Sequence, residues 1–144
     1  MSTINSYLRF NGNCNEAMAF YKDCLGGELT IQKIGESPMA GNMPQKMQDK
    51  IMHSTLKNDG ITIMASDLCD ENGLIKGNDV SLMLDCNSED EIRTTYAKLS
   101  GGGKKTHPLE VTFWNALFGD LTDKFGINWL LHYQLENPVQ VSEN

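Results

Sequence analysis

Residues 13–27 read NCNEAMAFYKDCLGG, and this stretch decides the fold because it predicts a capped helix that stops at a glycine pair. Asn13 stands three residues before Glu16, the spacing at which each side chain accepts a hydrogen bond from the other residue's backbone N–H. An apolar stripe follows at helical spacing and consists of Ala17, Phe20, Tyr21 and Cys24. Gly26 and Gly27 end the helix, because glycine readily adopts the left-handed conformation of a C-terminal cap.

The same pattern returns 75 residues further along the chain, in a second predicted helix over 88–103. Tyr96 corresponds to Tyr21, and Ser88 and Glu91 repeat the capping spacing. The apolar stripe of this helix consists of Ile92, Tyr96 and Leu99. The offset is longer than the ~20–50 residues of stacked solenoid repeats. It therefore indicates duplication of one module within the chain.

Each predicted helix follows one strand-like run and precedes three more, in which apolar and polar residues alternate with the period of a strand. In the first half the runs cover 4–10, 28–35, 50–57 and 61–66, and in the second half 79–86, 104–108, 115–121 and 127–133. The sequence therefore predicts an α+β fold of two βαβββ modules. We place these halves at about 1–67 and 78–134 of a single domain over 1–144, with a polar tail at 135–144.

Residues 36–48 stand outside this pattern and are predicted to form a long mobile loop. Met39, Met43 and Met47 recur in it every four residues, which invites a copper(I) interpretation because thioethers suit that ion. We favour a pliable apolar lid over a pocket, since methionine adapts to irregular surfaces.

Composition narrows the class of protein. Hydrophobic residues make up 40% and charged residues 22% of the chain, as in ordinary globular proteins. No apolar run approaches the ~18 residues of a membrane span, and no secretory signal is visible, so we expect a cytoplasmic protein that does not bind membranes. A net charge of −7 argues against nucleic acid as a partner. The four cysteines form no C-x-x-C pair, so we expect free and mostly buried thiols.

Taken together, these elements resemble the vicinal oxygen chelate superfamily, which includes glyoxalases, bleomycin-resistance proteins and extradiol dioxygenases. More narrowly, the chain is similar to the PhnB-like, demethylubiquinone-methyltransferase-like subgroup over residues 4–134. The resemblance is carried by Tyr7 to Ala17 (YLRFNGNCNEA), Phe20-Tyr21, Leu25-Gly26-Gly27, Lys50-Ile51-Met52-His53, Phe113-Trp114, Leu121 to Gly126 (LTDKFG) and Trp129.

The resemblance implies that each half curls its strands into a partial barrel, with the helix on the convex side. The concave sides then enclose a cavity for a small molecule, commonly in a homodimer. Metal-using members place one ligand on the first and last strand of each half, and the matching positions here are Asn5, Met64, Asp79 and Leu130. Leu130 has no donor atom and Met64 has only a soft thioether, unsuited to magnesium, zinc or ferrous iron. We therefore predict no catalytic metal and no cofactor.

The resemblance also implies a set of site residues. The pocket-lining candidates are Asn5, Tyr7, Arg9, Met64, Asp79, Trp114 and Leu130, and the catalytic candidate is His53. His53 is either a general base at the cavity or a hydrogen-bonded strand histidine with a structural role, and we favour the second. Arg9 either binds a carboxylate or phosphate group, or it pairs with Asp79 or Asp85.

The three other aromatic residues considered, Trp114 among them, and the two other histidines are interpreted from their side-chain chemistry and their position in the sequence. Phe113, Trp114 and Phe118 offer flat surface on which a planar ligand stacks, or else they pack in the core or a dimer interface. We expect His107 in a turn before Pro108 and His132 exposed near a strand end, and no partner can be named for either histidine.

From these observations we expect a small-molecule-binding protein that acts as a homodimer and lacks the usual divalent metal. One alternative is a lyase or isomerase acting on a small carbonyl compound, with His53 or Asp79 as base. Another is sequestration of a cationic drug, which the negative net charge favours. Methyl transfer finds no support, because no strand is followed by the G-x-G-x-x-G turn that approaches a nucleotide-like cofactor.

Overall fold

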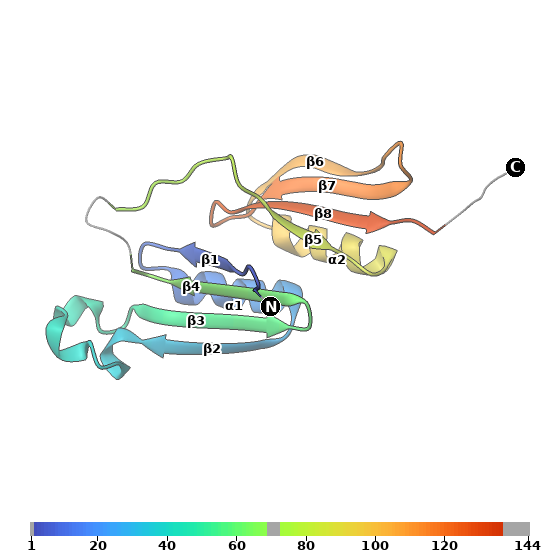
Figure 1. Ribbon diagram of the computed structural model, residues 1–144. Coiled ribbons are helices and arrows are strands. Elements are labelled where there is room, and N and C mark those ends of the chain that lie inside the picture. Colours follow the sequence, from blue (N-terminus) through green and yellow to red (C-terminus); the bar gives the residue numbers. More distant parts are fainter. Residues whose placement is uncertain (1, 69–72, 137–144) are drawn as a thin grey trace, which may run out of the picture. The chain divides into compact units, whose positions relative to one another are not determined.

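The computed structural model of the chain describes residues 2–68 and 73–136, and these fall into two compact units. The described residues up to Ile75 form the first unit, and those from Lys76 onward form the second. Each unit has the order strand, helix, strand, strand, strand, so the predicted pair of βαβββ modules is confirmed (Figure 1). Cys69 and the part of the predicted tail after residue 136 lie outside the described residues.

The first unit contains β1 (Ser6–Arg9), α1 (Cys14–Leu25), β2 (Glu28–Lys33), β3 (Ile51–Asn58) and β4 (Ile61–Ser66). Its strands form one open mixed sheet in the order β1-β4-β3-β2, in which β1 runs parallel to β4 and the other pairs are antiparallel. Helix α1 packs on one face of this sheet, against β2, β3 and β4. β4 has the predicted bounds, and the turn before it contains Asp59 in the left-handed conformation, with φ of 50°.

The second unit contains β5 (Leu82–Asp85), α2 (Glu89–Ser100), β6 (Lys104–Val111), β7 (Ala116–Thr122) and β8 (Asn128–Gln134). The strand order β5-β8-β7-β6 repeats that of the first sheet, again with one parallel pair, β5 and β8. β5 begins at Leu82, later than the predicted Asp79, and β6 continues past Pro108 to Val111. The prediction that His107 lies in a turn is therefore wrong, because His107 is a strand residue.

Strand alternation gives each sheet a helix-covered face and an open face, by which we mean the face that the helix does not cover. On the covered face of the second sheet, Leu117, Leu121 and Leu131 are at most 2% exposed, and α2 buries its predicted stripe against this layer. In α1 the stripe differs from prediction, because Met18 is buried while Phe20 is half-buried. The open faces carry polar and aromatic side chains, among them those of the candidate site.

The start of α1 is held differently from the sequence prediction. Asn13 makes no side-chain cap hydrogen bond, so the predicted capping box is wrong for this helix. Asp67, which is buried at the end of β4, takes its place: its Oδ1 accepts hydrogen bonds from the backbone N–H groups of Gly12 (2.9 Å) and Cys14 (3.0 Å). Its Oδ2 accepts from the N–H of Ile51 at 2.8 Å. A carboxylate satisfies these orphan donors better than an amide, because its hydrogen bonds are charge-assisted.

The start of α2 follows the predicted cap more closely. Ser88 Oγ accepts a hydrogen bond from the N–H of Glu91 at 3.0 Å, as the capping spacing predicts. The Glu91 carboxylate reaches one residue further back than expected, to the N–H of Asn87 at 2.7 Å. One helix is therefore capped by its own sequence, and the other by a residue more than 50 positions away.

The segment predicted as a loop at 36–48 contains two short 3₁₀ turns, Ala40–Asn42 and Gln45–Met47, and a third, Ile34–Glu36, leads into it. The side-chain amide of Gln48 closes it by donating to the carbonyl oxygens of Ala40 (2.9 Å) and Met43 (3.1 Å). The three methionines of this segment are all half-buried. The predicted role of the segment as a lid stays a prediction.

The cysteines and the two helices can be compared with what composition led us to expect. Cys14 and Cys86 are buried free thiols, as expected, and Cys24 is buried as well. Among the residues described, neither helix has the length and apolar character that crossing a bilayer would require.

Candidate functional site

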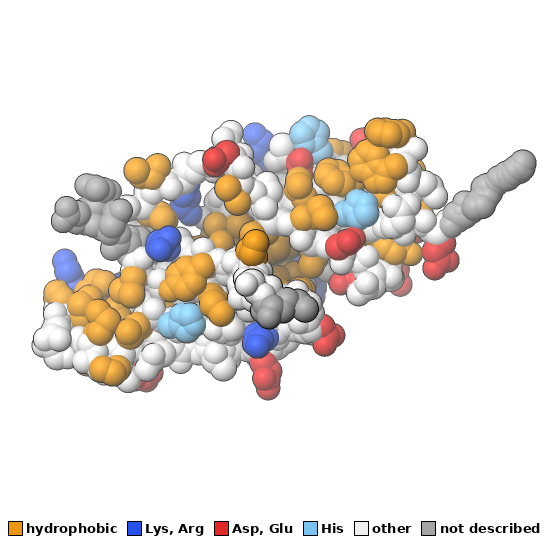
Figure 2. All heavy atoms as spheres, viewed as in Figure 1, with side chains coloured by type: hydrophobic (Ala, Val, Ile, Leu, Met, Phe, Trp, Pro, Cys, Tyr) orange, Lys and Arg blue, Asp and Glu red, His pale blue; other side chains and the backbone are white. Residues whose placement is uncertain are grey.

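The open face of the second sheet carries a pocket of about 470 Å³ at the end where β6 turns into β7. We call it the ring pocket, because three aromatic side chains contribute to its wall. Its lining residues are His107, Pro108, Glu110, Val111, Thr112, Phe113, Trp114, Phe118 and Asp120. Figure 2 shows hydrophobic side chains gathered at the surface over this end of β6 and β7, with an imidazole close by.

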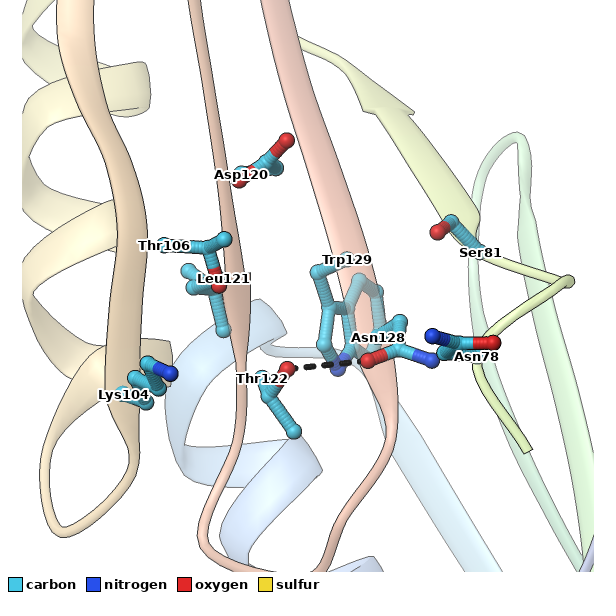
Figure 3. A pocket seen from close by; sticks show the side chains of 9 residues that line it. All are labelled: Asn78, Ser81, Lys104, Thr106, Asp120, Leu121, Thr122, Asn128 and Trp129. Carbon is cyan, nitrogen blue, oxygen red and sulfur yellow. Dashed lines mark hydrogen bonds between the residues drawn. The ribbon is translucent and has the colours of Figure 1, made fainter. Parts of the chain in front are cut away.

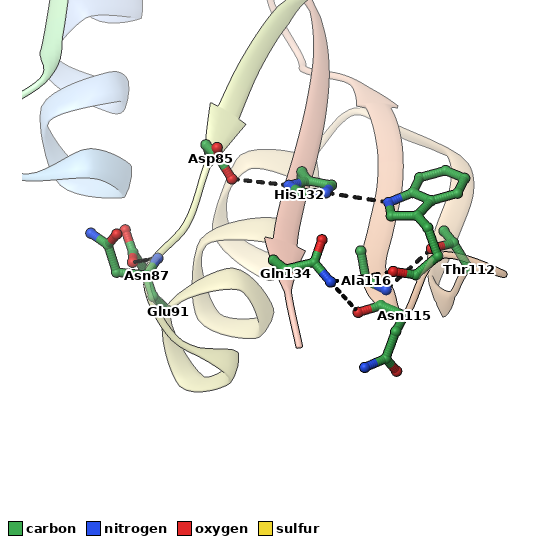
Figure 4. Close-up of polar contacts among 9 residues, drawn as sticks. Asp85, Asn87, Glu91, Thr112, Asn115, Ala116, His132 and Gln134 are labelled. Carbon is green, nitrogen blue, oxygen red and sulfur yellow. Dashed lines mark hydrogen bonds and ion pairs between the residues drawn. The ribbon is translucent and has the colours of Figure 1, made fainter. Parts of the chain in front are cut away.

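A tight turn between β6 and β7 presents two of the aromatic rings. The N–H of Asn115, whose φ is 64°, donates to the carbonyl of Thr112, and Thr112 Oγ1 accepts from the N–H of Ala116 at 3.2 Å. From β8, the side-chain amide of Gln134 donates to the carbonyls of Trp114 (3.2 Å) and Asn115 (2.9 Å), as Figure 4 shows for Asn115. The backbone of the turn is therefore held from both sides, and with it the positions from which the two rings project.

The aromatic side chains contact one another edge to face. Phe113 and Trp114 have ring centroids 4.9 Å apart at 87°, and Trp114 and Phe118 have centroids 6.1 Å apart at 75°. Phe113 is 97% exposed and Trp114 is 44% exposed, so most of this apolar surface faces solvent. An exposed apolar patch on a fixed turn is typical of a binding surface rather than of a core.

An imidazole–carboxylate pair forms one wall of the ring pocket. His107 Nδ1 lies 2.9 Å from Asp120 Oδ1, across the β6–β7 pair. From the covered face, the Tyr96 hydroxyl lies 2.8 Å from the His107 carbonyl oxygen and 3.0 Å from that of Asp120, and shares its proton between them. Burial, and secondarily the charge of Asp120, raise the pKa of Tyr96, which keeps this hydroxyl protonated as a donor. The helix thereby fixes the backbone at both members of the pair.

The register of β6 over β7 is irregular beside this pair, and the irregularity shapes the pocket. The pairing shifts between His107 and Glu110, where Pro108 has no N–H to donate. A Cβ on Gly119 would lie 3.0 Å from the His107 carbonyl and 3.0 Å from Leu109 Cδ2, so β6 passes closely over this glycine. The absence of a side chain at Gly119 allows the bulge that displays Glu110.

A second imidazole–carboxylate pair lies on the same open face, between β5 and β8. His132 Nδ1 is 2.9 Å from Asp85 Oδ1 (Figure 4), and the Trp114 indole N–H points to His132 Nε2 at 3.5 Å. The Phe118 ring lies 6.3 Å from the imidazole, edge to face. The His132 side chain is only 19% exposed, so the prediction that it is exposed is wrong, and its partner, which the sequence could not name, is Asp85. Two residues of the ring pocket therefore contact an oriented imidazole.

A polar pocket of about 320 Å³ occupies the other end of this open face. Its lining residues are Asn78, Ser81, Lys104, Thr106, Asp120, Leu121, Thr122, Asn128 and Trp129 (Figure 3). Thr122 Oγ1 donates to Asn128 Oδ1 at 2.9 Å, and Asn128 Nδ2 donates to the carbonyl of Val80 at 3.3 Å. Asp120 lines both pockets, so they are neighbours on one surface.

Four of the predicted site residues lie together on the open face of the first sheet. The Tyr7 and His53 rings have centroids 6.0 Å apart, and the Arg9 guanidinium carbon lies 5.7 Å from the Tyr7 ring centroid. Met64 is the β4 neighbour of Tyr7. His53 Nε2 lies 3.2 Å from Thr55 Oγ1 on the same strand. Asn5 is exposed and immediately precedes β1.

The other three predicted residues, Trp114, Leu130 and Asp79, belong to the second unit. Trp114 is in the fixed turn, and Leu130 lies on β8 between Met83 of β5 and Asp120 of β7. Asp79 is exposed at a bend before β5. Asp85, which was one possible partner of Arg9, instead pairs with His132.

The donor chemistry of the superfamily's metal positions does not fit a divalent ion. Asn5 and Met64 belong to the first unit, and Asp79 and Leu130 to the second. A leucine side chain has no donor atom, and a thioether is a poor ligand for hard or borderline divalent metals. Within residues 2–68 and 73–136, no three histidine, cysteine, aspartate or glutamate side chains gather as a metal ion would require.

The pKa values of two buried thiols are raised, which makes these thiols less reactive. Burial, together with the negative charge of Asp67, raises the pKa of Cys14 to about 11, although the hydrogen bond between this thiol and the Ser54 hydroxyl partly offsets this. Burial and the charges of Glu91 and Asp85 raise the pKa of Cys86 to about 12. Both groups are neutral thiols at neutral pH, so neither is suited to act as a nucleophile.

This arrangement, with two open sheets each covered by one helix on one face, defines a protein of the glyoxalase/bleomycin resistance/dioxygenase fold. A glyoxalase/bleomycin resistance protein/dioxygenase family enzyme from Burkholderia phytofirmans PsJN has a TM-score of 0.61, with 92% of this chain and 96% of that one covered. At 13% identity, the likeness concerns the fold alone.

The chain belongs to the family whose model is described as 3-demethylubiquinone-9 3-methyltransferase, which matches residues 2–132. Protein YjdN from Escherichia coli (strain K12) is 34% identical over 146 residues, covering 95% of this chain and 99% of that protein. The crystal structure of protein PA1353 from Pseudomonas aeruginosa has a TM-score of 0.84 at 36% identity, covering 94% and 100% of the two chains. A PhnB protein from Bacillus cereus has a TM-score of 0.72 at 28% identity, covering 92% and 99%.

Proposed function

We propose that the protein binds a small planar organic molecule in the ring pocket. The observation that carries this proposal is the fixed turn, which presents a fully exposed Phe113 and a partly exposed Trp114 beside a pocket of about 470 Å³. Such a volume is within the range of small-molecule sites, roughly 300–1,000 Å³. We propose further that the protein acts as a homodimer in the cytoplasm, as expected from its sequence.

The physical basis is stacking on a pre-organised surface. Each aromatic pair gains about 0.5–1.5 kcal/mol beyond the burial of its area. Gln134 and Thr112 already hold the turn in place, so a ligand does not have to order it. Because binding does not have to bear the entropy cost of ordering the turn, the affinity for the ligand is higher.

Binding in this proposal needs no divalent metal, because the donors at the superfamily's metal positions are unsuited to one. The family name describes methyl transfer, yet neither strand-to-helix loop, 10–13 or 86–88, has the glycine-rich pattern that approaches a nucleotide-like cofactor. We therefore propose binding, and not methyl transfer, as the activity of this chain.

A cation is the second candidate ligand, and two carboxylates favour it. Glu110 and Asp120 line the same pocket as the three aromatic rings. A positive group over an aromatic face gains about 0.5–2 kcal/mol, and a carboxylate beside it adds to that attraction. Sequestration of a cationic aromatic drug would use both features.

The test is a thermal-shift titration with benzyltrimethylammonium and phenylacetate, which share a ring and differ in charge. A ligand at 100 times its Kd adds about 2.7 kcal/mol to the stability of the folded state. We expect stabilisation of the wild type that Trp114→Ala removes and that added EDTA leaves unchanged. Ile31→Ala, which deletes a partly exposed side chain of the first unit, is the control and should keep the full shift. Preference for the cation, lost in Glu110→Gln, supports the second candidate.

The alternatives have separate outcomes. If Phe113→Ser changes the mass measured by sedimentation and leaves both titrations unaltered, the aromatic patch is an interface between copies and the ring-pocket proposal fails. The lyase or isomerase alternative requires turnover of a small carbonyl compound that His53→Ala abolishes. Stoichiometric zinc, iron or manganese in the purified protein would contradict the metal-free part of the proposal.

A further inference from the structure

His132 stands apart from the other two histidines, because it is both oriented and largely withdrawn from solvent. Its Nδ1–H donates to Asp85 Oδ1 at 2.9 Å, which leaves Nε2 as a hydrogen-bond acceptor. The side chain is 19% exposed, whereas that of His107 is 72% exposed. A lone pair held on a mostly desolvated ring gains more from a new donor than one that already faces water.

The donor that this lone pair now has is a poor one. The Trp114 indole N–H reaches His132 Nε2 at 3.5 Å, beyond the 2.7–3.2 Å of a good hydrogen bond. Among the described residues no other side chain is placed to donate to this atom. The acceptor is thus oriented and weakly satisfied, and two residues of the ring pocket contact it.

We propose that His132 Nε2 recognises a hydroxyl group on a planar ring, so that the ligands of the ring pocket are phenols or enols. This inference rests on the proposed function and names the chemical class of its ligand. His132 does not itself line the pocket, but Trp114 and Phe118, which do, both contact it. The ligand ring packs against these two residues, and its O–H becomes the donor to His132 Nε2 when the weak 3.5 Å contact of the indole N–H is released. Asp85 is a positioning residue, because it holds the proton on Nδ1 and keeps Nε2 as the acceptor.

The other charged groups of this open face do not provide the same recognition. Asp120 is paired with His107, and Glu110 offers a carboxylate exposed to solvent. A carboxylate also accepts from a hydroxyl, but in water this gains little, because solvent competes for both partners. The preference for a hydroxyl should therefore depend on His132 rather than on either acid.

The experiment compares 4-methylphenol with 4-methylanisole, which have the same ring and differ in the hydroxyl proton. A phenol with pKa near 10 stays protonated at neutral pH. We expect calorimetric titration of the wild type to show about five- to tenfold tighter binding of the phenol, the worth of one net hydrogen bond. His132→Phe should bring this ratio close to one, and His132→Gln, whose amide oxygen also accepts, should restore part of it.

Two further variants sharpen the test. Asp85→Asn should lower the phenol-to-anisole ratio by about two- to threefold, because the tautomer is then no longer fixed; a merely structural role would weaken both ligands alike. His107→Phe alters the other paired imidazole and should leave the ratio unchanged, whatever it does to each affinity. The inference is overturned if the two ligands bind equally to the wild type, or if the ratio survives His132→Phe. If neither ligand binds at all, the ring-pocket proposal itself fails.

Discussion

Replacing Asp67 by asparagine should destabilise the protein strongly, although the two side chains have nearly the same shape. Asp67 is 5% exposed and accepts three backbone hydrogen bonds, two on Oδ1 and one on Oδ2. An asparagine that keeps its oxygen toward Gly12 and Cys14 must point its amide N–H₂ at the N–H of Ile51, so one acceptor becomes a donor facing a donor. The opposite orientation loses two bonds instead of one.

The magnitude follows from these contacts. Losing a buried hydrogen bond to a charged group costs about 1.5–3 kcal/mol. The two remaining bonds lose their charge assistance, which makes up roughly half of their strength, at about 1 kcal/mol each. The sum is about 3.5–5 kcal/mol, a large part of the ~5–15 kcal/mol of a typical domain.

The assay is urea denaturation, and the control is Asp49→Asn, which neutralises an exposed carboxylate. With a denaturant slope of about 2 kcal/mol per molar, the Asp67→Asn midpoint should fall by roughly 1.5–2.5 M. The Asp49→Asn midpoint should change by less than about 0.3 M, as surface substitutions do. Equal midpoints for the two variants would refute the reasoning, because they would mean that the three bonds contribute nothing net.

Three further substitutions test the packing behind the site. Tyr96→Phe removes the donor shared by two strand carbonyls and should cost about 1–3 kcal/mol in chemical denaturation; an unchanged midpoint would contradict this. Gln134→Met frees the turn at Trp114 and should weaken ring-ligand binding several-fold at little cost in overall stability, measured by calorimetry. Burial raises the pKa of Cys86 from its ordinary 9.0 to about 12, so the folded state keeps a proton that the unfolded state releases. Stability should therefore fall as pH rises from about 9 toward 12, less steeply in Cys86→Ala, and equal slopes would count against the shift.

The sequence predicted the βαβββ order because its signals are local. Glycine pairs after each helix and alternating runs in each strand depend only on neighbouring residues, and these were sufficient for both units. The start of α1 was mispredicted for the opposite reason. Its donors are satisfied by Asp67, which is distant in sequence, and no local pattern distinguishes such an aspartate from the exposed ones.

The candidate site could be predicted only in part. The resemblance to the family predicted that Tyr7, Arg9, His53 and Met64 share a face, and they do lie on one open face. This prediction succeeded because side chains alternate reliably along a strand once the strand is located. The two histidine–aspartate pairs were missed, since each depends on the register between strands. One signal was available: His132 is two residues from Leu130 on the same strand, so it shares its face. The parallel register that places Asp85 opposite His132 has no counterpart in sequence spacing.

The most direct test of ligand binding at the ring pocket is a two-dimensional ¹H–¹⁵N spectrum of the two tryptophan side chains during titration with 4-methylphenol. Trp129 is buried and donates its indole N–H to Asp123 at 2.9 Å, so its signal serves as an internal reference. We predict that the Trp114 indole signal, assigned by its loss in Trp114→Phe, moves saturably while that of Trp129 stays fixed. A Trp114 signal that does not move, or that moves without saturation, would contradict the account.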